Sequence, residues 1–493
     1  MIFAFIFVQK HVKLALIFVQ NKVEFALIFV QFAGLELEAV VGVYIKRTID
    51  DDLLEWKNDK KRKILLIRGA RQIGKSSSVR KLSQHFDFFL EIDFEKKREI
   101  HVLFNGNLNP REIAEKLSVV TAIPVIPGKT LVFFDEIQCC PNAISSLRYF
   151  YEDYPELHVI AAGSLLEFAL ESLPSFGVGR IRSIFMYPLS YKEFLIANGE
   201  YALWDKVCES SPEKPLFDLY HIKCLEYLKK FLLIGGMPEV VADYIESRNI
   251  NNSKNLLADL VTSFKSDFSK YKKRVPDLRI SAVFNAVVNQ SGGIFNYSRV
   301  DEINYRQVRE SVELLQNAGL VIPVIHSSSN ALPLGGEINL KKQKFILFDT
   351  GIFQQLSGLD LSDIILNNNI SLVNKGAIAE QFAGLELLKS RSCNTHDNLY
   401  FWSRDKPQSN AEIDYVISIN GNIIPLEIKS GSSGKMQSMH MFLNEKNAEY
   451  GIRVSLENFS VYDKIRVYPL YAIGRAVTAF TTDIDKKNGL IVT

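Results

Sequence analysis

The chain has 493 residues, of which 47% are hydrophobic and 23% are charged. This composition is typical of folded proteins and excludes general disorder, and the length suggests about three domains. Lys and Arg number 58 against 56 Asp and Glu, so net charge predicts no particular partner, and a nucleic-acid surface would need local clustering. Five cysteines without a CxxC pair indicate a reducing compartment, and we expect a cytoplasmic protein.

Residues 1–42 have an atypical, apolar sequence. The tetrapeptide IFVQ recurs with a period of 11 residues, at 6–9, 17–20 and 28–31. The segment QFAGLEL occurs twice, at 31–37 and 381–387. The longest charge-free run, 25–35, has 11 residues, which is too short for a membrane span of ~20 residues, and the charges do not follow a signal-peptide pattern. We therefore expect no membrane segment, and we hypothesise that these repeats are not native to the fold, which opens near Tyr44.

From Ile64 onward, short apolar runs alternate with amphipathic stretches. The runs that predict buried strands are ILLI (64–67), FFLEIDF (88–94), LVFF (131–134) and HVIAAG (158–163). Helix-like segments lie between them, as expected for a parallel sheet covered by helices. The pattern predicts an α/β domain over residues 43–200.

The rest of the chain divides into three predicted regions. Residues 201–275 have long helical periodicity, interrupted by IGGMPE at 234–239, and predict a helical lid or linker. Residues 276–355 combine helices with the strand-like LVIPVI and KFILFD, which suggests a winged-helix region. Residues 370–470 predict a second, separate α/β unit, in which a helix precedes LYFW, IDYVISI and NIIPLEIK.

The segment GARQIGKS satisfies the pattern G-x-x-x-x-G-K-[ST], after a predicted strand and before a predicted helix. Its glycines let backbone N–H groups surround an anion at the helix N-terminus. Lys75 would reach the outer phosphates of a nucleotide, and the Ser76 hydroxyl would bind Mg²⁺. The residues expected to contact ATP here are Gly69, Ala70, Arg71, Gln72, Ile73, Gly74, Lys75, Ser76 and Ser77.

A second element, LVFFDEIQ, places two carboxylates after a buried strand. Asp135 would bind Mg²⁺, and Glu136 would orient and deprotonate the attacking water. A solvated turn is the alternative for this pair. Ser164, after the next strand, would sense the γ-phosphate or cap a helix. Arg180 and Arg182 are either surface residues or cations that reach the phosphates of a neighbouring subunit in a homo-oligomer.

These motifs, together with YIKRTIDDDLLEW, MYPLSYKEFL and GGMPEVV, follow one another in an order that resembles the prokaryotic AAA-type ATPases with a C-terminal domain of unknown function. The resemblance covers residues 43–470. It implies an ATPase followed by a winged-helix region and a restriction-endonuclease-like domain. The residues that match the ATPase motifs of the family are Lys75, Ser76, Asp135, Glu136 and Arg180.

The C-terminal region carries three carboxylates and a lysine that suit Mg²⁺. Glu427 and Lys429 share one face of a strand, and a hairpin would bring Asp414 beside them, with Glu380 on the preceding helix. This spacing resembles the PD-(D/E)xK nuclease fold, although Ile413 replaces its proline. The alternatives are a Glu427–Lys429 ion pair on an ordinary hairpin and a nuclease-like fold that only binds.

Two basic segments are candidates for contact with DNA. Arg306 and Arg309 lie on the predicted winged-helix segment, but neighbouring glutamates dilute their charge. The run KSDFSKYKKR, at 265–274, is the densest basic stretch, with a solvated helix face as its alternative.

The main hypothesis is a Mg²⁺-dependent ATPase whose nucleotide state moves the winged-helix and nuclease-like modules, in a process involving DNA. The alternatives are an ATP-gated nuclease, with catalysis at the C-terminal carboxylates and Lys429, and a nucleotide switch that binds a protein partner without cleavage.

Overall fold

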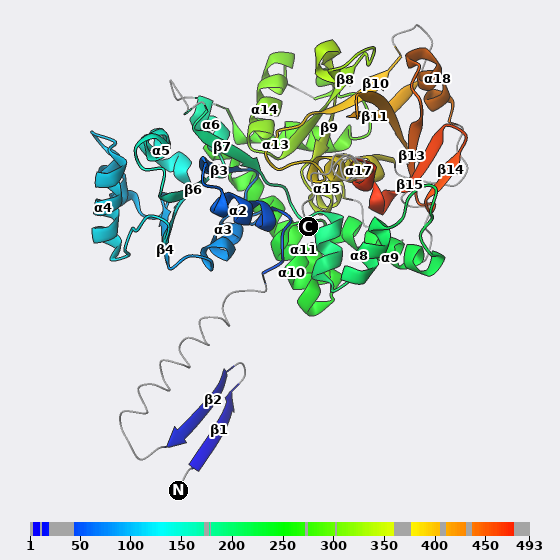
Figure 1. The fold of residues 1–493 in the computed structure, drawn as a ribbon. Helices are drawn as coiled ribbons and strands as arrows, with labels where there is room; N and C mark the ends of the chain where they lie inside the picture. Colours follow the sequence, from blue (N-terminus) through cyan, green and yellow to red (C-terminus); the bar gives the residue numbers. More distant parts are fainter. Residues whose placement is uncertain are drawn as a thin grey trace. The chain divides into compact units, whose positions relative to one another are not determined.

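A computed structural model describes residues 3–9, 12–18, 44–171, 177, 179–271, 275–300, 303–358, 376–404, 411–429 and 436–477. The chain divides into two compact units, Met1–Ile45 and Lys46–Thr493. In the first unit, strands β1 (Phe3–Gln9) and β2 (Val12–Phe18) pair antiparallel (Figure 1). The remainder of the predicted repeat segment lies outside the described residues.

The second unit begins with a five-stranded sheet in which all neighbouring strands are parallel. Its strands, in the order in which they pair, are β4 (Phe88–Asp93), β5 (Thr130–Asp135), β6 (His158–Ala162), β3 (Ile64–Arg68) and β7 (Ile181–Phe185). The four strands predicted from apolar runs are confirmed. Strand β7 was not predicted, because its sequence IRSIF carries Arg182 and only one of its residues is fully buried.

Helices cover both faces of this sheet. They are α2 (Ile49–Asn58), α3 (Lys75–Ser83), α4 (Pro110–Thr121), α5 (Pro141–Asp153) and α6 (Leu166–Glu171), with short 3₁₀ turns at Arg98–Phe104 and Ile137–Cys139. Alternate residues of the strands, such as Leu66 and Phe134, join α4 and α5 in one hydrophobic core, while α3 packs on β5 and β6. The sheet therefore carries the loops that follow its strands at one common edge, where ligands bind in such folds.

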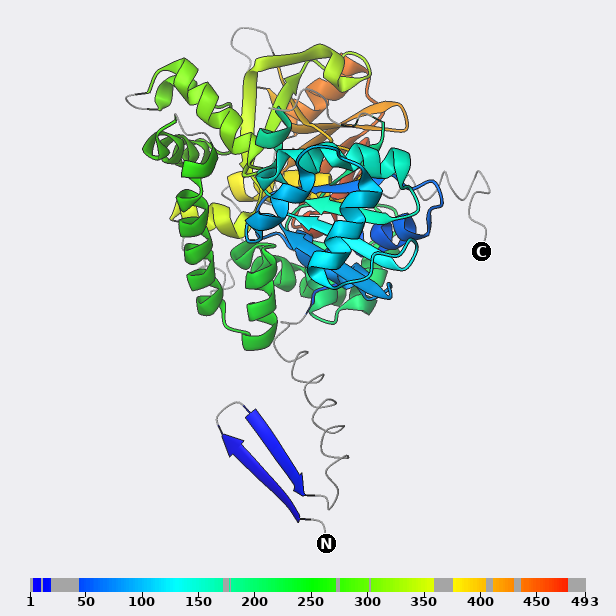
Figure 2. The same cartoon turned by 90° about the vertical axis from the view of Figure 1, so that its left-hand side faces the viewer.

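After β7 the chain forms a group of helices with no strand between them among the described elements, shown in green in Figure 2. Its members are α7 (Tyr191–Ala197), α8 (Tyr201–Cys208), α9 (Asp218–Ile234), α10 (Pro238–Ser247), α11 (Ile250–Ser266) and α12 (Phe268–Tyr271). Over the residues that the structure describes, no helix has the length and apolar character needed to cross a membrane.

The remaining elements build an eight-stranded mixed sheet with the order β14-β15-β13-β12-β11-β10-β8-β9. Its strands are β8 (Val321–Ser327), β9 (Ile338–Leu347), β10 (Leu399–Ser403), β11 (Glu412–Ile419), β12 (Asn422–Ile428), β13 (Gly451–Ser455), β14 (Ser460–Tyr462) and β15 (Ile465–Pro469). The accompanying helices are α13 (Asp277–Asn289), α14 (Tyr305–Asn317), α15 (Thr350–Ser357), α17 (Gly376–Lys389) and α18 (Gln437–Lys446), with 3₁₀ turns at Tyr297–Arg299, Leu334–Glu337 and Leu470–Ala472.

This sheet differs from the two separate modules expected for 276–355 and 370–470. Strand β8, expected in a wing, pairs in parallel with β10 of the C-terminal region, through Leu399 opposite Val324. The pairing gives hydrogen-bond partners to the backbone N–H and C=O groups on one side of β8, which would have none in a free wing. The predicted hairpin of β11 and β12 is present, and it turns at Asn420 and Gly421, both with positive φ.

Candidate functional site

The loop from Gly69 to Gly74 joins the carboxyl end of β3 to the start of α3. Gly69 and Gly74 have φ values of 140° and 93°, which favour glycine. A β-carbon at Gly69 would lie 2.3 Å from the carbonyl oxygen of Met186, so this close approach also requires glycine. The loop thus turns its backbone around the N-terminus of α3, as an anion site requires.

Lys75 begins α3 and is buried. Its Nζ donates hydrogen bonds to the carbonyl oxygens of Gly69 (2.9 Å) and Ala70 (2.6 Å), so the ammonium lies within the loop. Burial lowers the pKa of Lys75 to about 8, although the nearby carboxylates of Glu136 and Asp135 oppose this shift. The site therefore holds a partly desolvated cation that an anionic ligand would stabilise.

The next residue, Ser76, reaches the end of β5. Its Oγ donates a 2.6 Å hydrogen bond to Oδ2 of Asp135, which is the last residue of that strand. Burial raises the pKa of Asp135, and the bond from Ser76 opposes this shift. A hydroxyl and a carboxylate on adjacent elements are hard oxygen ligands, so this pair fits Mg²⁺ with the remaining ligands supplied by water and phosphate.

Glu136 follows Asp135 in a left-handed conformation, with φ of 47°. Its Oε2 accepts hydrogen bonds from Oγ of Ser164, at 3.1 Å, and from Nε2 of Gln138. Ser164 is buried after the end of β6, so the structure joins the predicted phosphate-sensing serine to the predicted water-activating glutamate. Gln138 was not predicted, because a glutamine two residues after the carboxylates has no distinguishing pattern.

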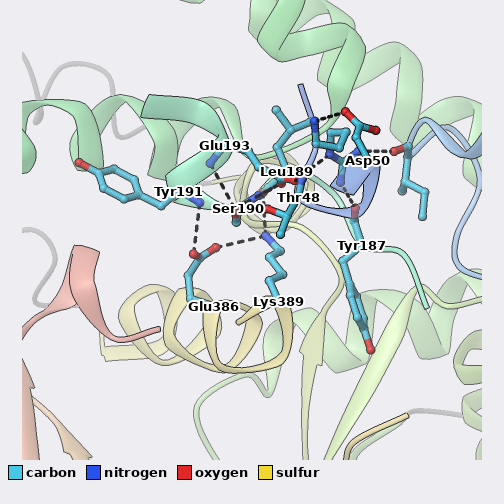
Figure 3. A network of polar contacts seen from close by, with 11 residues as sticks. Thr48, Asp50, Tyr187, Leu189, Ser190, Tyr191, Glu193, Glu386 and Lys389 are labelled. Carbon is cyan, nitrogen blue, oxygen red and sulfur yellow. Dashed lines mark hydrogen bonds and ion pairs between the residues drawn. The ribbon is translucent and has the colours of Figure 1, made fainter. Parts of the chain in front are cut away.

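A buried polar network supports the loop from the other side (Figure 3). Arg47 pairs with Glu193 (Nε to Oε1, 3.1 Å), and the two side chains are only 7% and 8% exposed. The same guanidinium donates to the carbonyl oxygens of Ile73, within the loop, and Tyr187. Glu193 also accepts from the backbone N–H of Thr48, at 2.6 Å. Arg47, Thr48 and the segment PLSYKEF are therefore fixed against the phosphate-binding loop.

The network continues to α17 of the C-terminal region, as Figure 3 shows. The backbone N–H of Tyr191 donates to Oε2 of Glu386 at 3.2 Å. Lys389 Nζ donates to the carbonyl oxygen of Leu189 at 2.9 Å and lies 3.4 Å from Glu386 Oε1. The first domain and the C-terminal sheet region are thus joined by buried, hydrogen-bonded charges.

Two further segments, which follow the first domain in sequence, contact the phosphate-binding loop itself. A β-carbon at Gly319, after α14, would lie 3.2 Å from the backbone nitrogen of Ala70. Arg71 forms an ion pair with Asp267, which ends α11. A cavity of about 430 Å³ is lined by Gly69, Ala70 and Ser164 from the first domain and by residues 316–319.

The basic run 265–274, for which DNA contact and a solvated helix face are the two predictions, packs partly against the first domain, although its Lys270 is exposed. Within it, Asp267 pairs with Arg71, Lys270 pairs with Glu95 (3.5 Å), and Tyr271 stacks on Phe168 with ring centroids 5.6 Å apart. These contacts place 267–271 against the phosphate-binding loop. Residues 272–274, which carry the rest of its basic charge, lie outside the described residues.

Arg180 and Arg182 lie away from the loop edge of the sheet. Ile181, the first residue of β7, pairs with Ile64 at the amino end of β3, whereas the loop follows the carboxyl end. Arg180 Nε lies 2.8 Å from Oε1 of Glu152 on α5. This position excludes contact between Arg180 and the phosphate-binding loop of its own chain, and contact with a neighbouring subunit stays a prediction.

The C-terminal carboxylates gather around a lysine that was not predicted. Lys344 of β9 has a side chain that is 2% exposed, and its Nζ lies 2.8 Å from Oε1 of Glu380 and also contacts Glu412. Burial would lower the pKa of Lys344, but Glu380, Asp414 and Glu412 raise it. Burial raises the pKa of Glu380 to about 7, although Lys344 opposes this. Lys344 is the last of three lysines in KKQK, and nothing in the sequence distinguishes it from Lys341 and Lys342, so this role had no sequence signal.

Asp414 and Glu427 lie on the neighbouring strands β11 and β12. Asp414 Oδ2 accepts from the backbone N–H of Ile428 at 2.7 Å. Glu427 Oε1 pairs with Lys429 Nζ at 2.6 Å, as in the ion-pair alternative, but Glu427 is buried rather than on the surface. Among the described residues, no group of three or more Asp, Glu, His or Cys side chains is arranged to hold a metal ion, so Glu380, Asp414 and Glu427 do not converge as a three-carboxylate site.

The predicted winged-helix arginines lie on α14. Arg306 is exposed, and Arg309 Nε lies 3.0 Å from Oε1 of Glu313 one turn later. Contact between these residues and DNA stays a prediction.

Comparison with protein families matches three separate parts of the chain. Residues 61–195 match the AAA domain. Residues 225–363 and 375–473 match two domains of unknown function, DUF8612 and DUF4143. No curated protein matches the sequence. The described site, from the phosphate-binding loop to Ser164, lies within the matched AAA domain.

Several solved structures are similar over part of the chain. The Walker-type ATPase of Pyrococcus abyssi has a TM-score of 0.40 at 16% identity and covers 64% of this chain and 96% of its own. A signal-transduction ATPase with a tetratricopeptide repeat sensor from Pyrococcus horikoshii has a TM-score of 0.26 at 11% identity, with 69% and 48% covered. Cdc6p from Pyrobaculum aerophilum has a TM-score of 0.25 at 11% identity, with 66% and 96% covered. The assignment of residues 61–195 as a P-loop AAA domain rests on the family match and the loop geometry.

Proposed function

We propose that this protein is a Mg²⁺-dependent ATPase and that its nucleotide state controls the C-terminal region. The observation that carries the proposal is the convergence of four side chains at one edge of the parallel sheet. Lys75 and Ser76 start α3, Asp135 ends β5 and Glu136 follows it, and Ser76 and Asp135 are already hydrogen-bonded. Each of the four has the chemistry that phosphoryl transfer to water requires.

The roles follow from charge and position. The loop N–H groups and Lys75 would hold the phosphates, and Ser76 and Asp135 would hold Mg²⁺, which supplies neutralisation of phosphate charge when bound. Glu136 would accept the proton of the attacking water, with its carboxylate oriented by Ser164 and Gln138.

Control of the elements that follow the AAA domain is supported by two contacts with the loop, from Gly319 after α14 to Ala70 and from Asp267 after α11 to Arg71. We propose that the controlled partner is DNA or another protein and that the protein acts in the cytoplasm, which its five free cysteines favour. Cleavage is not part of the proposal, because Lys344 already pairs with Glu380, the helix carboxylate of the nuclease-like set.

The test is phosphate release from ATP with Mg²⁺, for the wild type and for Lys75→Ala and Glu136→Gln, with and without DNA. Lys81→Ala is the matched control, since Lys81 lies on the same helix but is exposed. Turnover that is lost in both site variants and kept in the control supports the ATPase, and stimulation by DNA supports the nucleic-acid role. Turnover that survives in Lys75→Ala refutes the proposal.

A further inference from the structure

The junction between α11 and α12 packs on the proposed nucleotide site. Asp267 lies between the two helices, and its backbone N–H donates to the carbonyl oxygens of Ser263 and Phe264 at the end of α11. Phe268 is fully buried, and Tyr271 is buried and stacks on Phe168, which follows the phosphate-sensing Ser164 in sequence. The junction is therefore fixed between the first domain and the elements that follow.

Four charges meet at this contact. Arg71 pairs with Asp267 and lies 3.8 Å from Glu95 (Nη2 to Oε2). Lys270 lies 3.2 Å from Asp267 and 3.5 Å from Glu95. Two cations and two anions thus alternate, and the group is neutral as long as no further charge arrives.

Arg71 is the member of this group that belongs to the phosphate-binding loop. Burial would lower the pKa of Arg71, but hydrogen bonding and charge from Asp267 raise it, and Glu136 and Glu95 add to this effect. The guanidinium therefore lies within electrostatic reach of both Asp267 and the predicted water-activating Glu136.

A triphosphate on the loop would bring several negative charges to this place. Phosphate oxygens compete with a carboxylate for a guanidinium, because both accept paired N–H donors from it. The same charge would repel Asp267 and Glu95, because like charges interact more strongly in a partly buried site than in water. The side chains of Arg71 and Asp267 are 24% and 11% exposed, so the pair is open enough to exchange.

We propose that Arg71 is a nucleotide-sensing residue that exchanges Asp267 for the terminal phosphate of ATP, so that nucleotide binding releases the junction of α11 and α12. The inference rests on the proposed nucleotide binding and names the contact that transmits it.

The released junction leads directly to the C-terminal region. Phe268, the neighbour of Asp267, packs edge-on against Phe284 of α13, with ring centroids 5.8 Å apart. Phe264, one turn earlier, packs edge-on against Phe348, which follows β9. A change at Asp267 would therefore alter the packing of α13 and of the segment after β9.

The test measures the affinity for ATPγS by calorimetry and hydrogen exchange over residues 256–289, with the full-length protein. Asp267→Asn keeps the shape of the side chain and removes its charge. Asp259→Asn is the control, because Asp259 is exposed on the same helix. We expect Asp267→Asn to bind ATPγS roughly tenfold more tightly, since Arg71 no longer has to leave a charged partner. Even without nucleotide, its hydrogen exchange over this segment should equal that of the nucleotide-bound wild type.

The wild type alone provides a second test, which does not depend on the folding of a variant. ATPγS should increase exchange over 264–289, and unchanged exchange despite binding would overturn the switch while leaving the ATPase intact. Unchanged or weaker affinity in a folded Asp267→Asn protein would also overturn it. Absence of ATPγS binding to the wild type would overturn the proposed function together with this inference.

Discussion

The buried pair of Arg47 and Glu193 should be the costliest single contact to break near the phosphate-binding loop. Glu193→Ala would leave the guanidinium of Arg47 buried without its counter-charge and would remove an acceptor of the Thr48 and Ser190 N–H groups. Removing one member of a buried pair costs about 3–5 kcal/mol, because the remaining charge stays desolvated. Since Arg47 also holds the carbonyl oxygen of Ile73, part of this loss should weaken nucleotide binding.

The assay is a double-mutant cycle with Arg47→Ala and Glu193→Ala, separately and together. Hydrogen exchange of the α7 amides gives the local free energy of opening, which avoids assuming that the whole chain unfolds in one step. We expect the double variant to be less destabilised than the sum of the two single variants. Glu209→Ala serves as the control, because Glu209 pairs with Lys206 on the surface and should change nothing measurable. Additive effects of the two single variants would refute the reasoning.

Four other predictions follow from single side chains. Burial lowers the pKa of His158 to about 4 from 6.5, so the unfolded chain binds more protons than the folded one between these pH values. The free energy of unfolding, measured by chemical denaturation, should therefore fall by about 2 kcal/mol from pH 7 to pH 5, and this fall should be absent in His158→Gln. Because burial lowers the pKa of Lys75 to about 8, Lys75 should take up a proton when ATPγS binds above that pH. The dissociation constant of ATPγS should therefore rise roughly tenfold per pH unit between pH 8 and 10. Gly319→Ala should destabilise the protein by about 1 kcal/mol and weaken ATPγS binding, whereas Gly199→Ala, with a similar positive φ but open space, should only destabilise it. Lys344→Met should cost about 3–5 kcal/mol in thermal unfolding, because it leaves buried carboxylates without their cation.

Each of these predictions has an outcome that contradicts it. A pH dependence that persists in His158→Gln would assign it to another group. A flat binding curve above pH 8 would mean that Lys75 remains charged without nucleotide. Equal ATPγS affinity in both glycine variants would deny the contact with Ala70. If Lys341→Met, an exposed change on the same strand, is as costly as Lys344→Met, the buried cluster is not the cause.

The sequence was most informative where function depends on local spacing. The loop Gly69–Ser76 and the pair Asp135–Glu136 each follow an apolar strand, and the parallel sheet then brings them together at one edge. Strand alternation and the turn at Asn420 likewise predicted the hairpin that carries Asp414. In each case the relevant residues lie within a few positions of the element that places them.

The sequence was least informative where contacts join distant segments. Arg71 and Asp267 are 196 residues apart, and Lys344 and Glu380 are 36 residues apart on different elements. Neither pair produces a periodicity, because a charged residue after a helix or within a strand has the same sequence pattern whether it faces water or a partner. The pairing of β8 with β10 was missed for the same reason, since a strand pattern does not name its neighbour.

Two of the connections between the AAA domain and the elements that follow it differ in a way that decides how a nucleotide signal would travel. The network of Arg47, Glu193 and Lys389 is almost fully buried, and its charges are satisfied by backbone groups as well as by each other. A phosphate could not replace those partners without first opening the core, so this connection is a fixed joint. The cluster of Arg71 and Asp267 is partly exposed and adjoins the loop itself, so an incoming anion can compete for it directly. If nucleotide exchanges the partner of Arg71 as proposed, we therefore expect the change to begin at the α11–α12 junction while the buried network with α17 stays closed.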